Sequence, residues 1–137
     1  MKESQITINW KHFIEKNKPN KTETYELKLV NLEKTKSFAF NRVAEHQILG
    51  LQTSLEGLWL KIADTTSLSG FTNQKPFDVI WIKSYEAYVI VVFYMPRKFK
   101  KAVLIPINDF VKLKEVFPRK SIKLNELEGL GFKVYLI

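Results

Sequence analysis

Two stretches of the chain repeat apolar residues with the period of an amphipathic helix. In residues 4–16 the apolar side chains fall at i, i+4, i+7 and i+8: Ile6, Trp10, Phe13 and Ile14. A second stripe, over about residues 42–55, consists of Ala44, Ile48, Leu51 and Leu55. This spacing builds one apolar face on a helix. Asn41 is a candidate cap for the second helix, and Gly57 stands near its end, where glycine is favoured.

Residues 24–30 alternate instead, which is the period of a β-strand. Glu26 and Lys28 share one face of this strand, and the other face carries Tyr25, Leu27 and Leu29. Further strands are predicted at residues 58–64, 78–82, 87–95, 102–107 and 132–137. The stretch 87–95 is apolar on both faces, as in a central strand covered on both sides. We expect residues 83–86 to form a hairpin turn that pairs it with 78–82.

The C-terminal third adds two short helices. Asn108 or Asp109 can cap a helix that runs to about Phe117, and Ser121 can cap a shorter one that stops at Gly129. Helices therefore mix with strands along the whole chain, which predicts an α/β (α+β) domain with a central mixed sheet flanked by helices. The 137 residues suit a single domain.

Composition narrows the class of function. Lys and Arg exceed Asp and Glu by 22 to 14, and the formal net charge of +8 favours a polyanionic partner such as DNA, although a Lys-rich surface can also be merely solvated. The absence of cysteine excludes disulfides, thiolate metal sites and a cysteine nucleophile. No signal peptide is recognisable, and the longest apolar run is too short to span a bilayer. We expect a soluble, cytoplasmic protein with no membrane partner.

The tripeptide from Glu26 to Lys28 is the first candidate for chemistry. Its period of two places a carboxylate and an ammonium group side by side on one strand face. The carboxylate can hold Mg²⁺, which prefers oxygen ligands, and the lysine can orient water or stabilise developing negative charge. The same tripeptide is common on exposed, salt-bridged strands, so the pattern alone leaves both interpretations open.

Residues 25–51 resemble the core of RecU-like Holliday junction resolvases, which belong to the PD-(D/E)xK nuclease superfamily. In that family a strand bearing Glu-x-Lys precedes a short loop with Ser-Phe and a helix with Glu-His-Gln. The corresponding residues here are Glu26 and Lys28, Ser37 and Phe38, and Glu45, His46 and Gln47. A phage-type group of RecU-like proteins is similar over more of the chain, including residues 60–64, 75–78 and 87–94. The resemblance implies a restriction-endonuclease-like fold, Mg²⁺- or Mn²⁺-dependent hydrolysis of branched DNA during recombination, and a homodimer.

One departure from the family concerns a metal ligand. The resolvases carry a metal-binding aspartate before Glu-x-Lys, whereas no aspartate precedes Glu26 here and Thr24 stands in that region. We hypothesise that Asp78 takes this place in a permuted site, because strand 24–30 beside the expected hairpin would bring it to Glu26. Asp64 is a second candidate metal ligand, although it can equally be a turn former.

Other residues have open roles. Gln47 can bind a phosphate or a metal-bound water, or it can be a satisfied polar group at the helix edge. Glu3 can reach the site from the first helix or simply complement the helix dipole. His46 has the same two possible roles as Gln47. A histidine metal cluster is disfavoured, because the other histidine, His12, lies on a different helix.

Basic residues near two predicted loops are candidates for binding DNA phosphates. They are Arg97, Lys98, Lys100 and Lys101 in the first loop, and Arg119 and Lys120 in the second. Trp10, Trp59 and Trp81 are expected in the core rather than as base-stacking platforms. The sequence thus favours a metal-dependent DNA endonuclease. The alternatives are a catalytically inactive DNA-binding protein of the same fold and a phage-type protein that binds a host protein.

Overall fold

The strand that is apolar on both faces lies inside the main sheet. The computed structural model describes residues 2–17, 21–63 and 77–137. Its main sheet has the order β1-β5-β6-β8, with bounds Glu23–Asn31, Glu86–Met95, Phe99–Pro106 and Lys133–Leu136. β1 runs parallel to β5, and the other neighbours are antiparallel, so the sheet is mixed. The expected central mixed sheet is confirmed, and 87–95 falls within its inner strand β5.

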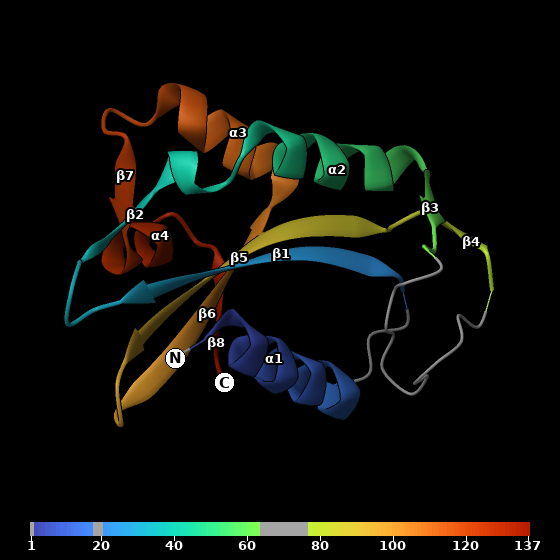
Figure 1. Cartoon of the computed structure of the whole chain (residues 1–137). Helices are drawn as coiled ribbons and strands as arrows, with labels where there is room; N and C mark the ends of the chain where they lie inside the picture. The colour runs from blue at the N-terminus through green and yellow to red at the C-terminus, as the bar shows by residue number, and fades with distance from the viewer. Residues whose placement is uncertain (1, 18–20, 64–76) are drawn as a thin grey trace.

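Helices cover both faces of this sheet (Figure 1). α1 (Glu3–Asn17) packs on one face, and α2 (Glu45–Glu56), α3 (Ile107–Val116) and α4 (Leu124–Gly129) lie on the other. β5 contributes side chains to the apolar layers on both faces of the sheet, because successive side chains of a strand point to opposite faces. Ile90 and Val92 contact the α1 layer, which also contains Ile6 and Trp10, whereas Val89 and Val91 belong to the opposite layer.

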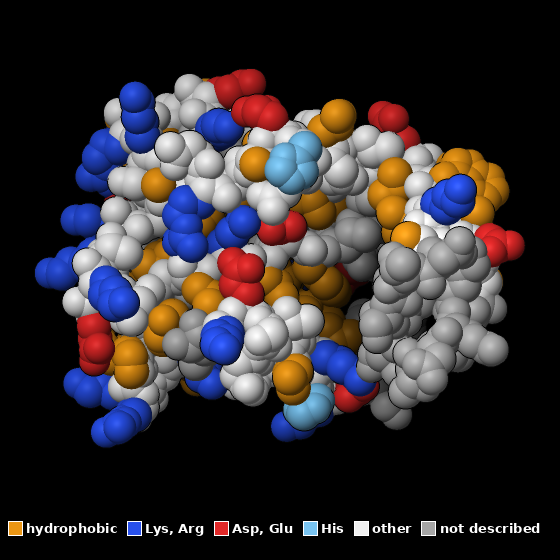
Figure 2. All heavy atoms as spheres, in the orientation of Figure 1, with side chains coloured by type: hydrophobic (Ala, Val, Ile, Leu, Met, Phe, Trp, Pro, Cys, Tyr) orange, Lys and Arg blue, Asp and Glu red, His pale blue; other side chains and the backbone are white. Residues whose placement is uncertain are grey.

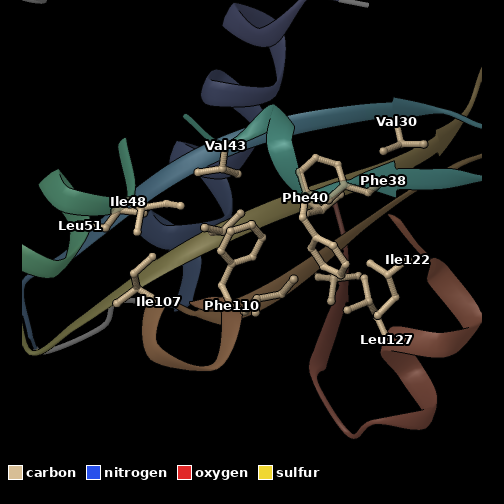
Figure 3. Packing of buried hydrophobic residues seen from close by; sticks show 14 of the residues in the cluster. Val30, Phe38, Phe40, Val43, Ile48, Leu51, Ile107, Phe110, Ile122 and Leu127 are labelled. Carbon is tan, nitrogen blue, oxygen red and sulfur yellow. The ribbon is translucent and has the colours of Figure 1, made fainter. Parts of the chain in front are cut away.

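The larger core lies under α2, α3 and α4 (Figure 3). Phe38, Phe110, Ile122 and Leu127 are fully buried there and come from four different elements. Phe38 lies on β2 (Ser37–Ala39), which pairs with β7 (Ser121–Lys123) in a small antiparallel sheet. This pairing was not predicted from the sequence, since strands of three residues carry too little periodicity to be recognised.

The predicted hairpin between residues 78–82 and 87–95 is wrong. β4 (Val79–Ile82) pairs with β3 (Leu58–Lys61) in a separate two-stranded sheet, which we call the ribbon. β5 has no free edge for β4, because β1 and β6 occupy both of its sides. The chain between β4 and β5 instead bonds elsewhere, since the Ser84 N–H donates to the Ser54 carbonyl at 2.8 Å and the Tyr85 N–H to that of Thr22 at 2.8 Å.

Several boundaries also shift. α2 begins at Glu45 with Ala44 as its N-cap, not at Asn41, because the preceding residues form the 3-10 helix η1 (Phe40–Arg42). Ser121 does not cap the last helix, since it lies in β7, and the N-cap of α4 is Lys123. In the part of the chain that the structure describes, no helix combines the length and the apolar character of a bilayer-crossing segment.

Candidate functional site

Glu26 and Lys28 lie on the face of β1 that α2 covers. The other face, with Tyr25, Leu27 and Leu29, packs in the α1 layer, as the alternation predicts. The Lys28 Nζ is 3.2 Å from the Glu26 Oε1, and the two side chains are only 13% and 28% exposed. Lys28 therefore does not extend into bulk solvent but is held beside the carboxylate.

Gln47 joins this pair from the first turn of α2. Its Oε1 accepts a hydrogen bond of 2.9 Å from the Ala44 N–H, one of the unpaired donors at the helix start. That bond turns the amide so that its Nε2 donates to the Glu26 Oε1 at 2.8 Å. The helix start thus positions Gln47, and Gln47 in turn holds Glu26. The structure brings together three of the residues singled out from the sequence.

Two further contacts, not anticipated from the sequence, tie α2 and η1 to β1. The Thr24 Oγ1 is 2.7 Å from the Oγ of the buried Ser54, which donates its own proton to the Leu51 carbonyl at 2.6 Å. Thr24 must therefore donate to Ser54. The Arg42 Nη1 donates to the Leu29 carbonyl at 2.6 Å. Position 24, where the family resemblance leads one to look for a metal ligand, is occupied by a structural hydrogen bond.

The donor set at Glu26 fits a hard divalent cation in part. Lys28 and Gln47 both contact Oε1, and among the described residues no donor contacts Oε2. That oxygen is available to a cation, and Mg²⁺ is commonly held by one or two carboxylates together with substrate phosphates. Within residues 2–17, 21–63 and 77–137, however, no three His, Asp or Glu side chains cluster as a metal site. Further carboxylates have to come from elsewhere.

The hairpin that was expected to bring Asp78 to Glu26 does not form, because β4 pairs with β3. Asp78 is exposed and directly precedes β4, and its carbonyl accepts a 2.7 Å hydrogen bond from the Ile62 N–H, so it belongs to the ribbon. The ribbon lies beyond the start of β1 and outside the main sheet (Figure 1). Asp64 lies outside the described residues.

Glu3 is not brought to the site. It is exposed in the first turn of α1, which packs on the face of the sheet opposite to Glu26. His46 is also exposed, although it directly precedes Gln47 on α2. Neither side chain joins the group formed by Glu26, Lys28 and Gln47.

The basic residues gather mainly at one end of the molecule. Figure 2 shows Lys and Arg side chains along the left-hand side, over the ends of β1, β5 and α3. Arg97 and Lys98 are exposed at the tip of the β5–β6 hairpin, and Arg119 and Lys120 are exposed between α3 and β7. Lys100 and Lys101 were expected in a loop but lie within β6, where they pair with Tyr94 and Phe93.

Two of these six cations are already engaged by acids. Lys101 lies 3.7 Å from Glu128, and Arg119 forms an ion pair with Glu126. Both pairs are partly exposed, and such pairs contribute little to stability.

The tryptophans divide between the core and the surface. Trp10 is buried, with 4% exposure, as expected. Trp59 and Trp81 are 67% and 51% exposed on the ribbon, so their assignment to the core is wrong. The ribbon is separate from the main sheet, and no described helix or sheet buries these two rings. A repeated Trp-x-Lys pattern, at 59–61 and 81–83, was the available sequence signal.

Two tyrosines on the opposite face of the sheet have altered acidity. Burial, followed by the nearby Glu23 carboxylate, raises the pKa of Tyr88 to about 12. The same two causes raise the pKa of Tyr25, whose hydroxyl donates to the Glu23 Oε1 at 2.6 Å. These groups face α1 and belong to packing rather than to the Glu26 site.

No family model, curated protein or solved structure matches this chain.

Proposed function

We propose that the protein is a divalent-metal-dependent DNA endonuclease of the PD-(D/E)xK type that acts on branched DNA. The observation that carries the proposal is the convergence of Glu26, Lys28 and Gln47 on one partly buried strand face. A carboxylate, an ammonium group and a positioning amide are the groups that phosphodiester hydrolysis requires around a scissile phosphate. The net charge of +8 and the basic end of the molecule suit a polyanionic substrate.

In this proposal Glu26 holds Mg²⁺ or Mn²⁺ through Oε2, and the metal supplies Lewis-acid activation of the phosphate. Lys28 stabilises the negative charge that develops on the phosphate oxygens and helps to orient water. Gln47 fixes the Glu26 carboxylate. Asp78, together with Asp64, is the proposed source of the additional carboxylates. The chain that follows the ribbon is anchored near the start of β1, where the Tyr85 N–H donates to the Thr22 carbonyl.

The test is cleavage of a four-way junction and of matched linear duplex with Mg²⁺ or Mn²⁺. Glu26→Gln and Lys28→Met should each lower the cleavage rate by about a hundredfold or more, since each removes a charge that acts on the transition state. Asp78→Asn and Asp64→Asn test the additional ligands in the same assay. The matched control is the exposed pair Lys11 and Glu15 on α1, 3.8 Å apart, where Glu15→Gln and Lys11→Met should leave the rate unchanged.

The second candidate is a catalytically inactive DNA-binding protein with this fold. The lack of a three-residue acid or histidine cluster in the described part of the chain favours it. Salt-sensitive binding of DNA by the wild-type protein, with no cleavage in either metal, would select this candidate over the enzyme. Cleavage that persists in Glu26→Gln would overturn the assignment of the site.

A further inference from the structure

The ribbon presents an aromatic face that neither the core nor the Glu26 site uses. Register pairs Trp59 with Trp81 and Lys61 with Val79, so these four side chains lie on one face, because directly opposed residues share a face. The indole rings contact each other with centroids 5.1 Å apart. Figure 2 shows hydrophobic side chains and a basic one on the outer right-hand side, over β3 and β4. We call this set, with Lys83 directly after β4, the aromatic face.

The position of Trp81 is built into the backbone. A Cβ at Gly57 would lie 2.2 Å from the Trp81 ring, so the indole covers a residue that has no side chain. Gly57 also has a φ of 128°, which side-chain-bearing residues rarely adopt. The Trp81 ring therefore packs on the backbone at the junction of α2 and β3, and the Trp59 ring contacts the Trp81 ring. The exposed indoles form a supported platform rather than two unrelated surface residues.

The charged residues of the aromatic face itself are basic, and the exposed acid Glu56 lies beside it at the end of α2. Lys61 and Lys83 are exposed and follow their tryptophans by two residues, and none of the five residues of the aromatic face is acidic. A cation–π contact lies next to the ribbon, where the Lys21 Nζ is 3.5 Å from the centroid of the exposed Tyr85 ring. Asp78 is paired with Ile62 by its backbone and so falls on the other face by register.

We propose that the aromatic face binds unpaired bases of single-stranded DNA. Aromatic rings that stack on successive bases, with cations that follow the backbone, are the combination that non-specific single-strand binding uses. A second copy of the chain is a poorer occupant, because it would bring its own Lys61 and Lys83 to a surface that is already positive. The inference rests on the proposed function for the choice of DNA as the polymer, and it names the unpaired segment of a branched substrate as what the ribbon contacts.

Binding is measured by fluorescence anisotropy of a labelled oligothymidylate in EDTA, where cleavage cannot contribute. An abasic strand of equal length serves as the second probe, because it has the phosphates without the bases. The wild-type protein should bind the oligothymidylate more tightly. Trp59→Ala and Trp81→Ala should each weaken that binding about 5-fold to 100-fold and leave abasic binding unchanged, whereas Trp59→Phe should retain most of the affinity.

Leu60→Ala is the matched control, because Leu60 is 40% exposed on the opposite face of the same strand. It should stay within about twofold of the wild type for both probes. Lys61→Met should weaken both probes alike and reduce the salt dependence of binding. Unchanged unfolding midpoints for the tryptophan variants exclude a loss of fold.

Three outcomes would overturn the inference. The tryptophan variants could bind oligothymidylate as the wild type does, or weaken both probes equally. Alternatively, Trp59→Ala could abolish self-association in sedimentation without changing oligothymidylate binding, which assigns the face to a second copy. Because no metal is present, failure here is separate from failure of the endonuclease proposal, which the Glu26→Gln cleavage assay decides.

Discussion

The amide of Gln47 donates a 2.8 Å hydrogen bond to the Glu26 carboxylate while its oxygen caps the start of α2 at the Ala44 N–H. One side chain thus satisfies a helix end and orients the acid on the neighbouring strand. Gln47→Leu removes both bonds, so the free energy of unfolding should fall by about 1 to 2 kcal/mol.

Urea unfolding measures this loss. Gln52→Leu is the control, since Gln52 lies later on the same helix and its side chain forms no hydrogen bond within the described part of the chain. It should change the unfolding free energy by less than about 0.5 kcal/mol. Equal losses in the two variants would show that the bridge between α2 and β1 is not a stabilising contact.

Gly57 should tolerate no side chain. Gly57→Ala places a methyl group against the Trp81 ring at a φ of 128°, so it should cost about 2 kcal/mol or more. Trp81→Ala in the same chain should recover part of the loss, because it removes the clash but not the backbone strain. Gly50→Ala is the contrast, since a Cβ there meets nothing within 4 Å and alanine favours the helix interior. In thermal unfolding, Gly57→Ala should have a lower melting temperature than the wild type and Gly50→Ala a higher one.

Stability should fall in alkaline solution. The pKa of Tyr88 rises from 10.0 to about 12 on folding, so the folded state favours the protonated phenol. The free energy of unfolding contributed by protonated Tyr88 is fully present below the pKa of the unfolded state. It is lost as pH rises from that pKa to the pKa of the folded state. The urea midpoint should therefore drop between pH 10 and about pH 12. Tyr88→Phe should reduce this drop.

Arg97 combines an unfavourable backbone with an exposed charge. It has a φ of 63° at the tip of the β5–β6 hairpin, where the Lys98 N–H donates to the Met95 carbonyl at 3.0 Å. Glycine suits that turn position better. Arg97→Gly should therefore keep or raise the unfolding free energy, by up to about 1 kcal/mol. DNA affinity should fall nonetheless, and the slope of its salt dependence should decrease by about one ion. Wild-type affinity in this variant would remove the hairpin tip from the DNA interface.

Local periodicity in the sequence correctly predicted which residues share a face of β1. The alternation of residues 24–30 placed Glu26 and Lys28 on one face, and the structure keeps them there. It could not show that Gln47 would meet them, because that contact depends on where α2 crosses β1. The resemblance to a nuclease core drew attention to Gln47, but only the geometry pairs it with Glu26.

The errors concern pairing between strands. Residues 78–82 were assigned to the nearest following strand, a reasonable choice when connections are short. The assignment failed because β1, far earlier in the chain, takes that side of β5. Trp59 and Trp81, expected in the core, are exposed because their strands pair with each other outside the main sheet. Apolar content alone does not distinguish a buried strand from an exposed ribbon.

The parallel pairing of β1 with β5 also has a consequence for how the protein is made. Glu23 is aligned with Glu86, so β1 has no strand partner in the main sheet until α2, the ribbon and β5 have all been synthesised. Contacts this distant in sequence delay folding, because a long loop must close before they form. The nascent N-terminal segment, with the backbone of β1 still unpaired, should depend on late-emerging residues and be vulnerable to aggregation during translation.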